Sequence, residues 1–201
     1  MTVSITRCCR RLTEALFVLC FALSSALAGE IGLSDLRLLP ADEGGFALSA
    51  ELELDFSQRI EEAVSKGLAL NFVAEFELTR PRWYWFDEKV VQTSQNWRLT
   101  YHALTRQYRL STGVLHQSFT SLAEALRVLS RLRHWPVIEP GRVHAGESFL
   151  AALRVYLDVS QLPKPFQVEA LSNKDWVLAS DWRRWHFTVP AAAAAGGGEA
   201  K

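Results

Sequence analysis

The sequence has few of the residues that would support specific chemistry. Only three of its 201 residues are cysteines, and all three lie within the first 20 positions: Cys8, Cys9 and Cys20. The rest of the chain therefore has no disulfide and no thiol nucleophile, so packing alone must stabilise it. Basic and acidic side chains balance at 22 each, which argues against bulk nucleic-acid binding.

A long apolar run is also missing after residue 28, where nothing approaches the roughly 20 residues of a membrane-spanning helix. Before that point, three arginines precede an apolar stretch at 15–27 that ends in Ala26-Leu27-Ala28. This order is typical of a secretory signal peptide with small residues at its cleavage site. The sequence predicts export, with cleavage after Ala28 and no stable membrane anchor afterwards. An uncleaved anchor is the alternative, which Glu14 disfavours because it shortens the apolar run.

Motifs of catalysis and cofactor binding are absent as well. There is no nucleophile elbow, no phosphate-binding glycine loop and no dinucleotide-binding turn. None of the five histidines pairs with another at helical spacing: His102, His116, His134, His144 and His186. We therefore expect no cofactor and no metal, and a metal site is left open only if distant strands assemble it.

The clearest pattern present is the stretch Phe46–Thr79. Apolar residues alternate with polar ones over Phe46–Phe56 and again over Leu70–Leu78, which predicts two half-buried strands. A short helix is expected between them at Ser57–Lys66, with Gly67 as its C-terminal residue. Its N-cap could be Asp55 or Ser57.

Further elements follow from the same periodicities. Ser121 and Glu124 form a capping box that opens a predicted helix at Ser121–Arg133, which Trp135-Pro136 should end. Strands are expected at Ile31–Leu39 (with a slip near Ser34-Asp35), Val90–Tyr101, Arg106–Leu115, Phe149–Val159 and within Trp176–Val189, and a rigid extended segment at Leu162–Phe166.

Two helices among about seven strands, mostly joined by short turns, predict a mainly antiparallel β fold of the sandwich type, α+β in class. A single open antiparallel sheet with helices on one face is the alternative. We expect one β-rich domain at 29–190, because a chain of this length can bury a sufficient core. The alanine- and glycine-rich segment 191–201 is predicted to be a disordered tail.

Aromatic and basic residues gather in two segments and supply the candidate binding residues. These are Arg80, Arg82, Trp83, Trp85, Asp87, Trp182, Arg183 and Trp185. Exposed, they would form a cation-and-aromatic surface for a peptide, glycan or lipid. In the alternative, the rings belong to the core and the arginines are solvated. The acid pair Asp87-Glu88 could serve a glycosidase, but adjacent turn residues usually diverge, which favours a solvated hairpin.

Several motifs carry a family resemblance: Arg106–Ser111, Phe119–Leu126, Leu162-Pro163-Lys164-Pro165-Phe166-Gln167 and Ser180-Asp181-Trp182. In this order, behind a signal peptide, the chain resembles an uncharacterised family of exported Gram-negative bacterial proteins, a domain of unknown function often labelled as a proline-rich signal-peptide or exported protein. The resemblance implies a periplasmic location. It also implies a gene neighbourhood with a two-component sensor kinase of the nitrogen-regulation type. It assigns no catalytic residue.

These observations favour a periplasmic, non-catalytic binding module for a protein partner in the cell envelope, such as a sensor, with oligomeric state open. Two alternatives remain at this point. One is an envelope hydrolase that acts on glycan or peptide through Asp87 or Glu88 with a histidine. The other is a carrier of a small apolar ligand, which would need a cavity inside the sheet.

Overall fold

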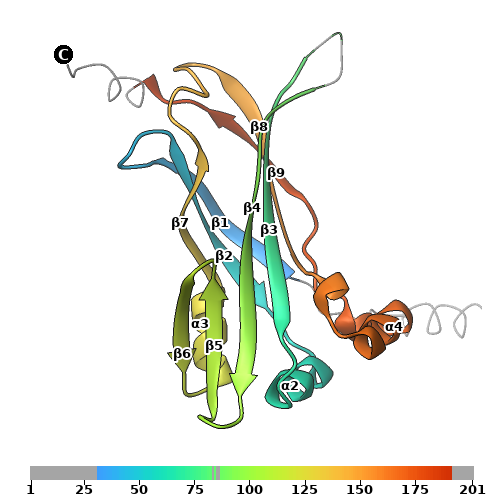
Figure 1. Ribbon diagram of the computed structural model, residues 1–201. Coiled ribbons are helices and arrows are strands. Elements are labelled where there is room, and N and C mark those ends of the chain that lie inside the picture. Colours follow the sequence, from blue (N-terminus) through green and yellow to red (C-terminus); the bar gives the residue numbers. More distant parts are fainter. Residues whose placement is uncertain (1–30, 83, 85–86, 192–201) are drawn as a thin grey trace, which may run out of the picture.

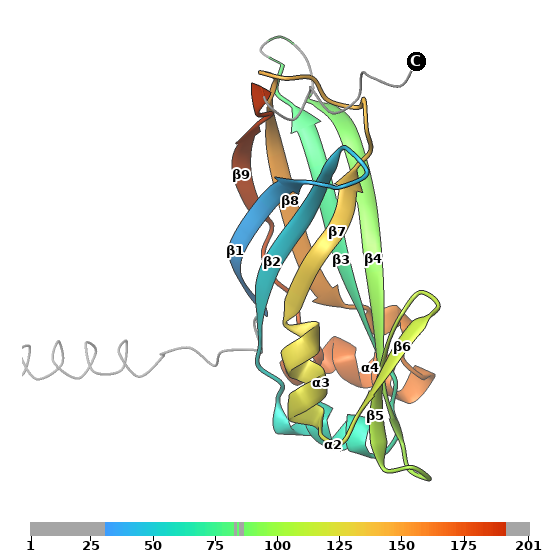
Figure 2. The same cartoon turned by 90° about the vertical axis from the view of Figure 1, so that its left-hand side faces the viewer.

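The computed structural model describes residues 31–82, 84 and 87–191. Its strands form two antiparallel sheets that face each other across one hydrophobic core (Figure 1). The smaller sheet has the strand order β1-β2-β7 and the larger one β6-β5-β4-β3-β8-β9; Figure 2 shows the smaller sheet in front. The strands are β1 (Ile31–Pro40), β2 (Phe46–Leu54), β3 (Leu70–Arg80), β4 (Glu88–His102), β5 (Gln107–Thr112), β6 (Leu115–Phe119), β7 (Arg131–Ile138), β8 (Ser148–Leu157) and β9 (Arg183–Thr188).

Three α-helices in the described part of the chain lie at one end of the sandwich (Figure 1). They are α2 (Gln58–Ser65), α3 (Leu122–Leu129) and α4 (Lys164–Ser172), and short 3₁₀ turns η1 (Val159–Gln161) and η2 (Lys174–Trp176) flank α4. No helix in these residues has the length and apolar character to cross a bilayer. The predicted class, mainly antiparallel β with helices, is confirmed. The alternative of a single open sheet is wrong, because the strands divide into two sheets.

The stretch β2-α2-β3 agrees with its pattern and connects the two sheets. All five apolar side chains that alternate along β3 are buried: Leu70, Phe72, Ala74, Phe76 and Leu78. The Ser57 hydroxyl accepts a hydrogen bond from the Ile60 N–H, so Ser57 and not Asp55 is the N-cap of α2. Gly67 ends the helix at φ +93°, in the left-handed region that favours glycine.

The two sheets meet through aromatic rings. Phe76 on β3 lies 6.5 Å from the ring of Trp135 on β7, in an edge-to-face arrangement. Phe46 on β2 contacts Phe187 on β9 in the same way at 5.1 Å. Such pairs stabilise a core by about 0.5–1.5 kcal/mol beyond the area they bury. The contacts therefore fix how the smaller sheet sits on the larger one.

The predicted helix at Ser121–Arg133 is too long at its C-terminal end. The capping box is present, because Ser121 accepts from the Glu124 N–H, but α3 ends at Leu129 and β7 begins at Arg131. Leu132 and Trp135 pair with Ala50 and Leu48 of β2, which buries both side chains in the core. Pairing with a distant strand thus overrides a helical periodicity, and the predicted stop at Trp135-Pro136 falls inside an edge strand.

Two other predicted segments also differ from the structure. Arg106–Leu115 is not one strand, because the chain turns at Gly113, where φ is +56°, and continues as β6. Leu162–Phe166 is not extended throughout, because α4 starts at Lys164. Proline has a fixed φ and no N–H, and both properties suit the first turn of a helix. By contrast, the predicted slip in the first strand is confirmed by a register shift between Ser34 and Arg37.

Ser180 belongs to the motif Ser180-Asp181-Trp182, and its buried hydrogen bonds give a first prediction about stability. It is 5% exposed; its hydroxyl accepts a 2.9 Å hydrogen bond from the Val155 N–H, and its own N–H donates to the Val155 carbonyl. We expect Ser180→Ala to lower the free energy of unfolding by about 1–3 kcal/mol, because the Val155 N–H loses a buried partner. Urea unfolding measures the change, with the exposed Ser94→Ala as control. Equal stability of the two variants would contradict this role.

Candidate functional site

Arg80, the first predicted binding residue, is held in place by neighbouring side chains. It ends β3, and its guanidinium lies 3.0 Å from Glu147 and 3.5 Å from Glu88. The same group lies over the ring of Phe149 at 5.3 Å. These contacts occupy Arg80 at the loop end of the β3–β4 hairpin, where its side chain is 38% exposed.

Arg82 and Asp87 lie just beyond the Arg80–Glu88 pair, which is the last pair between β3 and β4. Arg82 pairs with Glu88 through its guanidinium, and its backbone N–H donates to Asp87 at 3.3 Å. The two acids considered for hydrolysis, Asp87 and Glu88, are thus bound to arginine residues. Trp83 and Trp85 lie outside the described residues.

The second predicted group lies on the last strand. Trp182 is half-buried just before β9, and Arg183 is exposed at its first position. The Trp185 ring is 6.3 Å from Phe76 and packs against the hydrophobic core. Arg183 pairs with Leu153 of β8, which pairs with Phe76 of β3, so the start of β9 lies four residues down β3 from Arg80. No hydrogen bond, ion pair or ring contact joins Arg80, Arg82 or Asp87 to Trp182, Arg183 or Trp185 in the part of the chain that the structure describes.

Glu147, beside Arg80, gives a prediction for acid pH. Its pKa is lowered from 4.5, first by a hydrogen bond from the His144 N–H (2.9 Å) and further by the charge of Arg80. A lowered folded-state pKa stabilises the protein above the unfolded-state value, and this contribution is lost as the pH falls through the folded pKa. We expect Glu147→Gln to lower the melting temperature at pH 7, and the difference from the parent to shrink below pH 4.5. A difference unchanged between pH 7 and pH 3 would contradict this.

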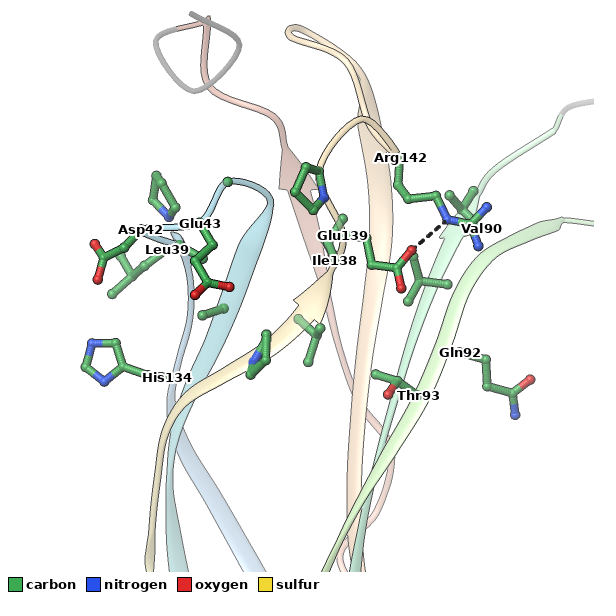
Figure 3. Close-up of a pocket in the computed structure, with 18 residues that line it drawn as sticks. Leu39, Asp42, Glu43, Val90, Gln92, Thr93, His134, Ile138, Glu139 and Arg142 are labelled. Atoms are coloured by element: carbon green, nitrogen blue, oxygen red, sulfur yellow. Dashed lines mark ion pairs between the residues drawn. The ribbon is translucent and has the colours of Figure 1, made fainter. Parts of the chain in front are cut away.

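A groove of about 740 Å³ lies elsewhere, between β4 and β7, and we call it the β4–β7 groove (Figure 3). The turn between β1 and β2, the strand β7 and the loop after it form one side, and Val90–Thr93 of β4 form the other. Gly45 fixes that turn against β7, because a Cβ at this position would lie 2.0 Å from the Ile138 carbonyl oxygen. Apolar side chains line much of the groove: Val90, Val91, Pro136, Val137 and Ile138.

The β4 side of the groove includes an unpaired strand edge. β4 is 15 residues long; β3 pairs with it from Glu88 to Leu99, but β5 pairs with it only from Trp97 to His102. Within the described part of the chain, Glu88–Asn96 has no strand on the side away from β3, and we call this segment the free edge of β4. It is free because the β5–β6 hairpin turns back after Thr112, which pairs with Trp97.

The free edge of β4 has polar side chains on the core face of the sheet, where a closed sandwich would have apolar ones. Thr93 and Gln95 pair across the sheet with the buried residues Phe76 and Ala74, so they lie on the core face of the sheet. Both are only half-buried, because the smaller sheet does not cover them fully. Figure 3 shows Thr93 extending from β4 toward β7. Polar residues on the core face are the one sequence signal that could have indicated the groove.

The rim of the groove carries an excess of negative charge. Asp42, Glu43 and Glu139 contribute three exposed carboxylates, whereas Arg142 is the single arginine or lysine among the lining residues. Arg142 lies 3.9 Å from Glu139 and so partly neutralises it. His134 also lines the groove and is exposed. An acidic rim around an apolar slot favours recognition of a cationic ligand.

Comparison with known proteins gives a family and no function. A family model described as a domain of unknown function (DUF4390) matches residues 28–186. No curated protein matches the chain. No solved structure matches it either.

Proposed function

The chain belongs to the DUF4390 family, and we propose that it is a non-catalytic binding module that holds an extended segment of a partner protein in the β4–β7 groove. The family assigns no activity, so the proposal depends on the geometry of the groove. The oligomeric state is not part of the proposal.

One observation carries it: the free edge of β4 borders the groove. An unpaired edge presents backbone N–H and C=O groups that another strand can satisfy. Many peptide-binding domains receive an extended peptide in this way, with backbone hydrogen bonds for affinity and side-chain pockets for specificity. Here the apolar side chains of Val91 and Val137 supply such contacts beside the edge.

The polar groups of the groove support binding better than catalysis. Its carboxylates, guanidinium and imidazole are spread along the rim, and the described residues contain no group of three potential metal ligands. A hydrolase would need two acids directed at one substrate. Instead, Asp87 accepts a hydrogen bond from the Arg82 backbone N–H, and Glu88 forms an ion pair with the Arg82 guanidinium.

The partner is proposed to lie in the periplasm. Residues 1–28 have the sequence of a cleavable export signal, and the family resemblance implies a Gram-negative envelope. An envelope sensor is the partner that we favour, because the family resemblance implies a gene neighbourhood that often includes a sensor kinase.

Export gives a direct prediction. In a Gram-negative host, the protein recovered from the periplasm should begin at Gly29 when its N-terminus is sequenced. Ala28→Phe should cause the uncleaved chain to accumulate, because the cleavage site requires a small residue. A second variant, Ala22→Phe, keeps the apolar run and leaves the cleavage site intact, so it should be processed normally. A full-length parent chain with Met1 in the periplasm would contradict the proposed cleavage.

The binding function is tested by selection from a random 12-residue peptide library against the immobilised full chain. We expect enrichment of sequences that alternate apolar and polar residues, because alternate side chains of a bound strand face the groove. Soluble peptide should compete for the selected clones. If no peptide is enriched above an unrelated bait, the proposed function is wrong.

A further inference from the structure

Two strand edges border the β4–β7 groove, and they differ in their capacity to pair with an added strand. β7 is the outer strand of the smaller sheet, and it contains Pro136, which has no N–H to donate. It also carries irregularities at His134 (φ +51°) and Val137, where its register with β2 shifts. Bulges and proline are the devices by which proteins protect a strand edge.

The free edge of β4 lacks these devices over most of its length. Its register with β3 shifts once, beside Val90, and is regular from Val91 to Asn96. This regular part spans about 20 Å, enough for five or six residues of an extended chain. It contains no proline and no glycine, so every second residue offers both an N–H and a C=O on the side away from β3.

The charge of the groove's rim indicates the charge of the segment that would bind there. The carboxylates of Asp42, Glu43 and Glu139 outnumber the one guanidinium of Arg142. Lys89, at the start of β4, is already paired with Glu77 at 2.7 Å and adds no free positive charge. An incoming strand with basic residues would complement this rim, and an acidic one would be repelled.

We infer that the occupant is a basic extended segment of a partner protein, which pairs with Val91–Asn96 of β4 and extends the larger sheet. The inference rests on the proposed function and adds the receiving edge and the charge of the ligand. The bound strand would continue the line of β5 along β4, and its inward side chains would cover Val91 and Thr93.

The same charges argue against two other occupants. A second copy that docked through its own groove would bring two acidic rims together. The chain's own segment 191–201 contains one acid, Glu199, and one base, Lys201, so it has no excess positive charge. A foreign basic segment suits the rim better than either.

The test uses two fluorescent peptides of identical apolar pattern, Lys-Thr-Val-Thr-Val-Thr-Lys and Glu-Thr-Val-Thr-Val-Thr-Glu, both with blocked ends, in which the charged residues share a strand face with the valines. Titration with the full chain should give a dissociation constant about tenfold lower for the lysine peptide, because several exposed charge pairs act together. Raising the salt concentration should reduce this preference.

Two charge variants test whether the preference for the lysine peptide arises from the acidic rim. The triple variant Asp42→Asn, Glu43→Gln, Glu139→Gln should bind both peptides within twofold of each other. The matched variant Glu51→Gln, Glu53→Gln, Asp55→Asn changes the charge equally at exposed residues of β2 and the segment after it, and it should keep the tenfold preference. An equal loss in both variants would contradict rim recognition.

Amide hydrogen exchange identifies which of the two strand edges, β4 or β7, pairs with the peptide. With the lysine peptide bound, exchange at Val91–Asn96 should slow at least tenfold at the amides that face away from β3, while Arg131–Ile138 stays unchanged. Protection of β7 alone would overturn the assignment to β4. Equal binding of the two peptides would overturn the assigned charge.

The outcomes separate this inference from the proposed function. If library peptides bind the groove but neither designed peptide does, the inferred chemistry fails and the binding function stands. If sedimentation shows a dimer that Thr93→Arg dissociates, a second copy occupies the groove and the inference fails. If deletion of 192–201 is needed before any peptide binds, the chain's own tail is the occupant, and the inference fails as well.

Discussion

Replacing Phe76 with alanine is expected to lower the free energy of unfolding by about 3–5 kcal/mol. Phe76 is fully buried at the centre of β3 and contacts one tryptophan from each sheet, Trp135 and Trp185. Removal of the ring leaves a cavity that these two large side chains cannot fill without moving. Because the mature chain would have no disulfide, no covalent link compensates for the loss.

Urea unfolding followed by tryptophan fluorescence measures this change, since rings beside Phe76 report on the core. Leu104→Ala is the control: Leu104 is fully exposed, and its removal should change stability by less than about 0.5 kcal/mol. If Phe76→Ala does not fold, Phe76→Leu should fold with a smaller loss. A loss below about 1 kcal/mol for Phe76→Ala would contradict the packing of the two sheets through this residue.

Replacing Thr93 with arginine is expected to reduce capture of the selected peptides by at least about tenfold, because the new side chain would fill the groove and repel a basic ligand. Thr93 is half-buried on the core face of β4, and its side chain extends toward β7 (Figure 3). The threonine is not fully enclosed, so the larger side chain can lie in the open groove and leave the fold intact.

Ser94→Arg is the matched control for this variant. Ser94 is the next residue of β4, and its side chain lies on the opposite face of the sheet, where it is exposed opposite Glu75. The two variants share the added charge and the strand. We expect peptide binding by fluorescence anisotropy to be lost in Thr93→Arg and kept in Ser94→Arg. Equal affinity of both variants would place the binding site outside the groove.

The sequence predicted those parts of the fold that depend on local pattern. The alternation along β2 and β3 and the slip in β1 are properties of neighbouring residues, and the structure confirms them. The sequence left the N-cap of α2 open between Asp55 and Ser57, and the structure has Ser57. The helix after Ser121 was predicted too long because Leu132 continues the helical stripe of α3. Only its pairing with Ala50, 82 residues earlier, makes Leu132 part of a strand.

The candidate site was harder to predict for a related reason. A free strand edge depends on where the neighbouring strand stops, and β5 stops at Thr112 because of a turn that the periodicity did not reveal. Residue type alone favoured tryptophan and arginine residues as the binding residues. In the structure, Arg80 forms ion pairs and Trp185 packs against the core. Thr93 and Gln95 give only a weak signal, because polar residues on a core face are recognised once the sheet partners are known.

The most direct test of the central claim is an isotope-edited NMR spectrum of the full chain bound to a library-selected peptide. We expect cross-strand contacts between backbone protons of the peptide and those of Val91–Asn96, with the peptide extended along β4. Contacts confined to the Arg80–Asp87 hairpin or to β7, or a helical bound peptide, would contradict it.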